Sequence, residues 1–406
     1  MLMFPNLMPS TVAALRTPHV LVDARFSARR RGGDRCRYEL AAHLSDQAAA
    51  RYTFLVYAET KTMLSERCRD ARTVTTESRP SRHPQGDFFE HVSLPLIGRR
   101  LGADIYHGTF NVLPLIDPAA ITVLTIHDMA VFAHPEAYGQ RFAAYGRTLI
   151  RAGVRRATQI LSVSDATAQE IVRYLPDACD KIVTIRNGVG EEFIRAASLG
   201  EGEVETACAR LNIPRPYVLF VGNLEPKKNL PRLIEAFQRL QSSAHLPHTL
   251  VIVGERLPSG PDGVPGGEER PGAVHFAGYV EDADLPLLYR GADLVAYPST
   301  YEGFGMPVLE GMAAGVPVLT SSVSSLPEVA GGAAMLVDPY DVEKIATGLH
   351  RALTDHQWRA AAAIAGPARA ETLSWAENAR QTSEVYCRLW EAAAAGDVVR
   401  TRKGRV

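Results

Sequence analysis

The sequence predicts an α/β protein with two domains, each built on a parallel β-sheet covered by helices. Two series of short apolar runs indicate the sheets, and a helical or loop stretch follows each run. A polar stretch of weak pattern, residues 190 to 216, separates the two series. With 406 residues, the chain is long enough to give both domains a full hydrophobic core.

The first domain is expected to span residues 18–190. Its strands are predicted in "HVLVDARF", "RYTFLVYAE", "GADIYHGTF", "AAITVLTIHD", "ATQILSVSD" and "DKIVTIRNG". These runs are short and apolar, as expected of strands buried on both faces of a parallel sheet.

The second domain is expected to span residues 215–372. Its strands are predicted in "YVLFVGN", "HTLVIVGE", "AVHFAGYV", "ADLVAYPS", "VPVLTSS" and "AAMLVDP". The proline- and glycine-rich stretch 257–272 predicts a mobile surface loop between two of these strands. Residues 373–395 have the amphipathic spacing of a helix.

The segment "STYEGFGMPVLEGMAAGVPVLTS" predicts a ligand site at the start of a short helix. Pro307 suits the first turn of a helix and Gly315 suits its end, so the helix should cover roughly residues 307–314. Gly303 and Gly305 allow the backbone before the helix to approach a ligand closely. Amide groups of a first turn bind anions, and the loop follows a strand, where α/β sheets bind ligands.

Two glutamates, Glu302 and Glu310, flank this predicted anion site. A lone glutamate of this kind would simply accept loop amides or cap the helix. Two of them would repel a bare phosphate, but they can accept hydrogen bonds from hydroxyl groups attached to one. A nucleotide sugar offers both a diphosphate and hydroxyls, so it fits the pair.

Glu302 and Glu310, as Glu-x7-Glu in "YEGFGMPVLEGMAAGVPV", resemble the signature of the retaining glycosyltransferases of family 4. The stretches "YVLFVGNLEPKKNLPRLIEAF", "SSLPEVAGGAAMLVDPYDVEKIATGL" and "IVTIRNGVGEEF" also resemble that family, and the likeness covers roughly residues 18–390. It implies the GT-B fold: two Rossmann-like domains face each other across a cleft, and a C-terminal helix, 373–395, crosses back to the first domain. The first domain would bind the acceptor and the second the nucleotide sugar.

The resemblance assigns donor contacts to the glutamate segment. Glu302 would hold sugar hydroxyls and Glu310 the ribose, while Gly303, Phe304 and Gly305 would lie beside the phosphates.

The turn "GNLEPKKN" in the second domain supplies cations for the diphosphate. Lys228 stands where the family has its phosphate-binding lysine, and Asn223 replaces the more frequent arginine, which makes Lys227 the substitute for the missing charge. Gly278 and Tyr279 fall where family members bind the base, although Tyr279 could equally be a packing residue.

In the first domain, Gly32 and Gly33 precede a helix that is expected to begin near Asp34. They predict either a plain turn or a loop that approaches the donor phosphate or the acceptor. The arginine run that ends at Arg31 is either a solvated face or a site for an anionic acceptor such as a lipid diphosphate. We expect Gly33 on the donor side, and Gly32 and Arg31 on the acceptor side.

His127 and Asp128 directly follow a strand, and therefore lie at the ligand-binding edge of the first sheet. His127 matches the family's cleft histidine near the donor sugar. The expected catalytic residues are therefore His127, Lys228 and Glu302, and Asp128 is expected to bind the acceptor.

Composition excludes several classes of protein. The net charge of -1 gives no general drive toward nucleic acid, and no apolar run is long enough to span a bilayer. The start of the chain lacks a signal-peptide pattern, and five scattered cysteines fit reduced thiols, so the cytoplasm is expected. The cysteines have no metal-ligand spacing, so neither metal nor cofactor is expected.

The resulting hypothesis is a retaining, metal-independent transfer of a hexose, with mannose from GDP-mannose as the best match, to a hydroxyl acceptor. The acceptor would be a saccharide or lipid-linked saccharide in polysaccharide or glycolipid assembly, with peripheral contact at the inner membrane face left open. A catalytically silent nucleotide-sugar binding subunit and a GT-B sugar-nucleotide epimerase remain as alternatives. A dinucleotide oxidoreductase is disfavoured because neither domain has GxGxxG after its first strand.

Overall fold

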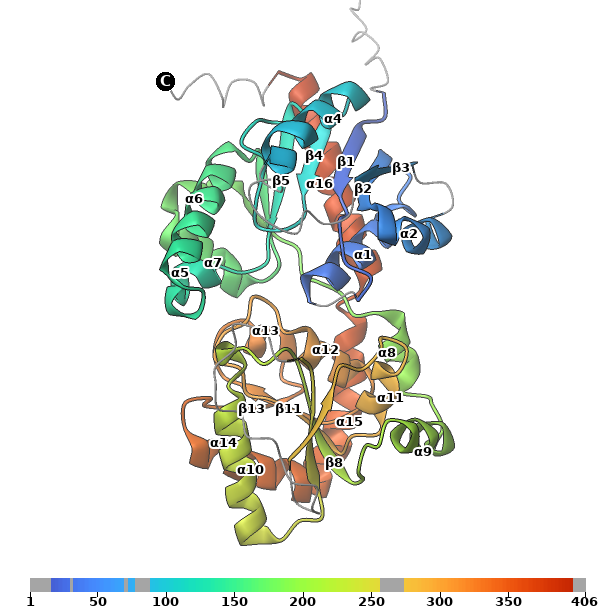
Figure 1. The fold of residues 1–406 in the computed structure, drawn as a ribbon, viewed down its shortest axis with the longest axis vertical. Coiled ribbons are helices and arrows are strands. Elements are labelled where there is room, and N and C mark those ends of the chain that lie inside the picture. The colour runs from blue at the N-terminus through green and yellow to red at the C-terminus, as the bar shows by residue number, and fades with distance from the viewer. Residues whose placement is uncertain (1–15, 30–31, 69–71, 77–87, 256–273, 397–406) are drawn as a thin grey trace, which may run out of the picture.

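The computed structural model describes residues 16–29, 32–68, 72–76, 88–255 and 274–396. Within these ranges the chain forms two lobes, shown one above the other in Figure 1, and each lobe contains one parallel sheet. The predicted two-domain α/β architecture is confirmed. The predicted loop at 257–272 lies outside the described residues.

The first sheet has the strand order β3-β2-β1-β4-β5-β6-β7, and all its pairings are parallel. This is the order of a Rossmann-type sheet extended by one strand, and it reverses direction beside β1. The strands are β1 His19–Asp23, β2 Arg51–Tyr57, β3 Arg72–Thr76, β4 Ile105–Gly108, β5 Ile121–Ile126, β6 Gln159–Ser162 and β7 Ile182–Thr184. The helices are α1 Gly33–Leu44, α2 Lys61–Arg67, α4 Leu94–Leu101, α5 Ala130–Ala133, α6 Gln140–Arg156 and α7 Asp165–Tyr174.

The second sheet has the order β10-β9-β8-β11-β12-β13, again with parallel pairings. Its strands are β8 Tyr217–Val221, β9 Thr249–Val253, β10 Val274–Gly278, β11 Leu294–Tyr297, β12 Val318–Ser321 and β13 Met335–Val337. Its helices are α10 Leu230–Ala244, α11 Leu285–Arg290, α12 Met306–Ala313, α13 Leu326–Ala330, α14 Val342–Thr354 and α15 His356–Glu371. The second sheet therefore repeats the strand order of the first without its seventh strand.

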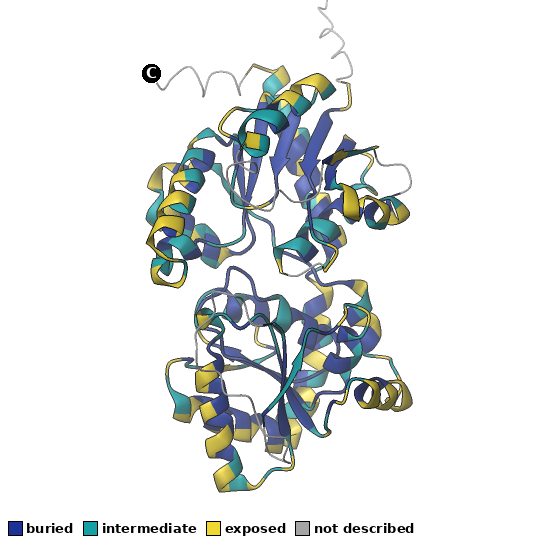
Figure 2. Cartoon of the chain, viewed as in Figure 1, coloured by how far each residue is buried: buried dark blue, intermediate teal, exposed yellow. Residues whose placement is uncertain are grey.

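The strands at the centre of both sheets are buried, as Figure 2 shows in dark blue. All five residues of β1 and all six of β5 are buried, because helices cover both faces of the sheet. This arrangement explains why these strands read in the sequence as continuous apolar runs.

Three local features differ from the sequence predictions. β3, "RTVTT", was not predicted, because it is a short edge strand, largely polar and only partly buried. The polar stretch between the domains contains two helices, α8 Glu191–Ala196 and α9 Glu201–Arg210. The helix after the glutamate loop, α12, starts and ends one residue earlier than expected.

The last described helix, α16 Trp375–Ala394, crosses back to the first lobe, as predicted from the resemblance (Figure 1). Its Trp375 and Tyr386 lie in the core beside β1 and α1. The Tyr386 hydroxyl lies 2.6 Å from His107 Nδ1, and Ser383 Oγ lies 3.0 Å from the Tyr52 hydroxyl. The two lobes are thus joined twice by the chain. In the described ranges we find no helix with the length and apolarity that crossing a membrane requires.

Candidate active site

A cleft of about 550 Å³ lies between the two lobes, at the carboxyl ends of strands from both sheets. The first lobe contributes the start of α1 and the loop after β5. The second contributes the loops after β8 and β9 and the glutamate loop before α12. The predicted site residues that line the cleft are Gly32, Gly33, His127, Asp128, Asn223, Lys227, Lys228, Tyr279, Glu302, Gly303, Phe304, Gly305 and Glu310.

Two predicted site residues are not found in the cleft wall. Gly278 does not line the cleft, and its carbonyl oxygen accepts a hydrogen bond of 2.8 Å from the Gly254 amide. Arg31 lies outside the described residues.

Glu302 is a buried carboxylate held by three donors on one oxygen. Its Oε1 accepts hydrogen bonds from Lys228 Nζ at 2.7 Å, the Tyr297 hydroxyl at 2.7 Å and Ser299 Oγ at 2.8 Å. Burial favours the neutral acid, but Lys228 and Lys227 outweigh burial and lower the pKa of Glu302. Glu302 is therefore ionised, and within the described chain its Oε2 takes no hydrogen bond.

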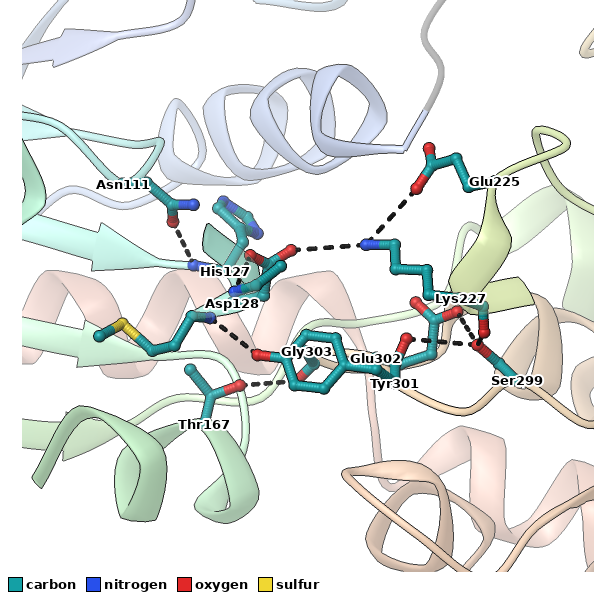
Figure 3. Close-up of polar contacts among 12 residues, drawn as sticks. Asn111, His127, Asp128, Thr167, Glu225, Lys227, Ser299, Tyr301, Glu302 and Gly303 are labelled. Carbon is teal, nitrogen blue, oxygen red and sulfur yellow. Dashed lines mark hydrogen bonds and ion pairs between the residues drawn. The ribbon is translucent and has the colours of Figure 1, made fainter. Parts of the chain in front are cut away.

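Lys227 lies between carboxylates of both lobes (Figure 3). Its Nζ is 3.8 Å from Asp128 Oδ2 in the first lobe and 3.6 Å from Glu225 Oε2 in the second. Burial opposes its charge, but Asp128 and Glu302 raise the pKa of Lys227, so it stays cationic. Two lysines therefore bring positive charge to one end of the cleft.

His127 is held as a neutral imidazole with a defined tautomer. Its Nε2 donates to the Thr109 carbonyl oxygen at 2.8 Å, because a carbonyl can only accept. Its backbone amide donates to Asn111 Oδ1 at 2.7 Å (Figure 3). Burial lowers the pKa of His127 to about 4. Near pH 7 its Nδ1 therefore carries a lone pair and can accept a hydrogen bond from a hydroxyl.

The glutamate loop of the second lobe is seated directly on the first lobe. The Gly303 carbonyl oxygen accepts hydrogen bonds from Ser164 Oγ at 2.6 Å and Thr167 Oγ1 at 3.1 Å. A Cβ atom built on Gly303 would lie only 1.6 Å from the His127 carbonyl oxygen. The loop can approach His127 this closely only because residue 303 is a glycine.

Tyr301 makes a second attachment between the lobes (Figure 3). Its hydroxyl accepts a hydrogen bond from the Met129 amide at 2.9 Å. The same hydroxyl donates one to Glu170 at 2.5 Å. The loop that carries Glu302 is thus fixed relative to the strand end that carries His127.

Glu310 is also buried, and each of its oxygens has a partner. Oε1 accepts from Arg35 Nη1 and Oε2 from the Tyr289 hydroxyl, both at 2.7 Å. Gly305, with φ of +115°, forms the turn into α12, whose first residues line the cleft below Glu310. Pro307 has no amide hydrogen, and the Val308 and Leu309 amides donate to the Gly305 carbonyl oxygen. Within the described chain, the Met306 amide therefore remains in this first turn for an anion in the cleft.

Sequence reasoning missed Arg35, Tyr289 and Tyr297. Tyr297 ends a buried strand five residues before Glu302, so its place at the ligand-binding edge was a signal that could have indicated it. Arg35 carries no such signal, because its partner lies 275 residues away in the other lobe.

The arrangement combines two lysines and a helix start for an anion with two carboxylates and a neutral histidine for hydroxyls. Among the residues that the structure describes, no three His, Cys, Asp or Glu side chains are grouped so that they could hold a metal ion. The cleft can therefore bind a molecule that carries both phosphate and hydroxyl groups.

Two family models match the chain. The model "Glycosyl transferases group 1" matches residues 209–369, and the model "Glycosyltransferase Family 4" matches residues 31–193. These two ranges correspond to the second and the first lobe.

Two relatives of the chain are mannosyltransferases of Escherichia coli. The chain is 34% identical to the O-antigen chain mannosyltransferase B of Escherichia coli, over 70% of this chain and 74% of that protein. It is 29% identical to the serotype-specific mannosyltransferase WbdA of Escherichia coli. That match covers 68% of this chain and 34% of WbdA.

Solved structures share the fold. Anabaena HepE, solved with UDP and glucose, superposes with a TM-score of 0.70 at 20% identity and covers 91% of this chain and 99% of HepE. The lipopolysaccharide glycosyltransferase WaaG superposes with a TM-score of 0.67 at 18% identity and covers 90% of this chain and 99% of WaaG. These likenesses confirm the GT-B fold.

Gly303→Ala should disrupt the seating of the glutamate loop, because the added Cβ meets the His127 carbonyl oxygen. We expect turnover to fall at least tenfold and the melting temperature to drop by several degrees, as for other overpacked core sites. Gly202→Ala is the control, since a Cβ at this position in α9 meets nothing within 4 Å. Wild-type activity and stability in Gly303→Ala would contradict the seated loop.

Proposed function

This chain belongs to the group 1 glycosyltransferases with a family 4 first domain, and from that premise we propose that it transfers mannose from GDP-mannose to a saccharide hydroxyl. The observation that carries the proposal is the Lys228–Glu302 pair, 2.7 Å long, which faces the cleft beside Lys227 and the start of α12. Mannosyltransferase relatives in O-antigen assembly support the sugar.

The leaving diphosphate would be stabilised by Lys227, Lys228 and the Met306 amide at the start of α12. Negative charge develops on this group as the bond from sugar to phosphate breaks. Cations and amides that are already in place stabilise that charge without reorganising, which is where electrostatic catalysis is largest. Asn223 stands where an arginine is more frequent, and Lys227 would supply the second positive charge in its place.

Hydroxyl groups of the donor would be held by the carboxylates and the histidine. Glu302 keeps Oε2 for sugar hydroxyls while Lys228, Tyr297 and Ser299 hold Oε1. Glu310 would accept the ribose hydroxyls on its remaining lone pairs, and His127 Nδ1 would accept from the sugar. Asp128, on the first-domain wall, would bind the acceptor.

The proposed transfer retains the anomeric configuration and uses neither metal nor cofactor. The acceptor oxygen would attack on the face that the diphosphate leaves, and the departing phosphate would take the acceptor proton. Glu302 is the carboxylate that this proposal assigns to the sugar, but one of its oxygens is already held by three donors. That arrangement supports a holding role for Glu302 over a nucleophilic one.

Two alternatives use the same cleft. A catalytically silent subunit would bind the nucleotide sugar without breaking it, and an epimerase would change the sugar nucleotide without an acceptor. Slow donor hydrolysis and acceptor-dependent release of nucleoside diphosphate distinguish transfer from both. We further propose a cytoplasmic enzyme whose saccharide acceptor is free or lipid-linked, with peripheral contact at the inner membrane face in the latter case.

Lys228→Ala should lower turnover by roughly tenfold to a thousandfold, the range found for electrostatic catalytic groups. Lys344→Ala removes an exposed lysine of α14 and serves as the control. Melting temperatures should be measured for both, because Lys228→Ala also leaves Glu302 without its nearest cation. An unchanged rate in a folded Lys228→Ala protein would remove Lys228 from the mechanism.

Activity should survive EDTA, since the lysines and the start of α12 provide the charge that a metal would otherwise supply. The assay compares initial rates before chelation, after it, and after Mg²⁺ or Mn²⁺ is restored. Complete loss that either metal reverses would show that the account of the leaving group is wrong.

GDP should inhibit far better than UDP at equal concentration, because a guanine edge would be read by groups around Tyr279. Product inhibition with both nucleotides measures this directly. Stronger inhibition by UDP, or hydrolysis of UDP-glucose while GDP-mannose is left intact, would overturn the donor but leave the reaction class standing.

A further inference from the structure

Arg35 reaches from α1 of the first lobe into the nucleotide side of the second. Its Nη1 lies 2.7 Å from Glu310 Oε1, and its Nη2 lies 2.7 Å from Asp282 Oδ1. Its side chain is 11% exposed, and its guanidinium lies 5.3 Å from the centre of the Phe193 ring. One buried cation therefore joins two carboxylates of the opposite lobe.

Glu310 depends on this arginine for its charge. The Glu310 side chain is only 4% exposed, and burial raises its pKa while Arg35 opposes that rise. Among the described residues, Arg35 is the only lysine or arginine that forms an ion pair with Glu310. The Tyr289 hydroxyl donates to the other oxygen but brings no positive charge.

The two partners of Arg35 lie at different parts of the predicted nucleotide site. Glu310 is on α12, where the ribose is placed by the proposed function. Asp282 follows β10, three residues after Tyr279, where the base is placed. Both line the cleft, as does Arg35.

We propose that Arg35 is a positioning residue that makes donor binding depend on closure of the two lobes. The proposal rests on the proposed function, which assigns the ribose to Glu310. A charged carboxylate accepts hydroxyl hydrogen bonds more strongly than a neutral acid. Glu310 receives its cation only when the first lobe is seated on the second, so the ribose site is complete only in the closed protein.

A second arginine between the lobes provides a matched control. Arg186 Nε lies 2.6 Å from Glu328 Oε1 on α13, and its Nη2 lies 2.5 Å from Asp165 Oδ2 at the start of α7. Like Arg35 it contacts two carboxylates, but none of these three residues lines the cleft. Comparison of the two arginines separates the specific role of Arg35 from a general role of ion pairs between the lobes.

The experiment compares the wild type with Arg35→Met, Arg35→Lys and Arg186→Met. It measures KM and kcat for the donor, and the Kd of GDP and of UDP by calorimetry between pH 5.5 and 8. Arg35→Met should raise the donor KM and the Kd of the tighter-binding nucleotide at least tenfold, with kcat at saturation within a few-fold of wild type. Arg35→Lys should recover part of the loss, and Arg186→Met should leave KM and Kd unchanged.

The pH dependence of the nucleotide Kd distinguishes this role from a merely structural one, which would leave that dependence unchanged. Nucleotide binding should weaken as the pH falls, because protonated Glu310 is a poorer acceptor. Without Arg35 the pKa of Glu310 rises further, so the weakening should begin at a higher pH in Arg35→Met than in wild type. If Arg35→Met fails to fold, Arg35→Lys carries the test, since one ammonium cannot bind both carboxylates as the guanidinium fork does.

Three results would overturn the proposal: wild-type KM and Kd in a folded Arg35→Met protein, an equal loss in Arg186→Met, or a lower melting temperature with an unmoved pH profile. These outcomes are distinct from failure of the proposed function. Tighter binding of UDP with the Arg35 effect intact would overturn only the donor, whereas wild-type protein that binds neither nucleotide would overturn both.

Discussion

Glu302 and Glu310 are buried carboxylates, and the site can exist only because each of them meets a cation. An unpaired charge in such a position would be neutralised or would destabilise the fold by several kcal/mol. Lys228, in the same lobe as Glu302, forms an ion pair with it. Glu310 forms its ion pair with Arg35 of the first lobe. One of the two buried ion pairs is thus complete within a single domain, and the other is made by both domains together.

Contacts of the backbone also hold the two lobes close together. Gly303 places the glutamate loop against the carbonyl of His127, and hydroxyls at the start of α7 donate hydrogen bonds to the Gly303 carbonyl oxygen. Positive and negative groups therefore gather within one cleft, although the net charge of the whole chain is only -1. The overall charge balance conceals a strongly polar site because the charges are paired locally.

Features encoded by neighbouring residues could be predicted from the sequence. The buried strands, the turn into α12, the two glutamates and the lysine turn all leave a local pattern. β3 was not predicted because it is an edge strand with half-exposed, polar side chains. Such a strand has neither a continuous apolar run nor a clear alternation of apolar and polar residues. The role of Arg35 could not be predicted for another reason. Its partner Glu310 lies 275 residues away, and sequence periodicity does not show which surfaces of the two lobes are in contact.

In the proposed complex, one cleft holds the diphosphate on lysines and the ribose on Glu310, with the lobes closed over both. A crystal structure of the protein with its tighter-binding nucleoside diphosphate would show whether the two groups bind in this way. We expect phosphate oxygens within hydrogen-bond distance of Lys228 Nζ and the Met306 amide, and ribose hydroxyls on Glu310 while Arg35 still contacts it. Phosphates placed away from both lysines, or a ribose without contact to Glu310, would contradict it.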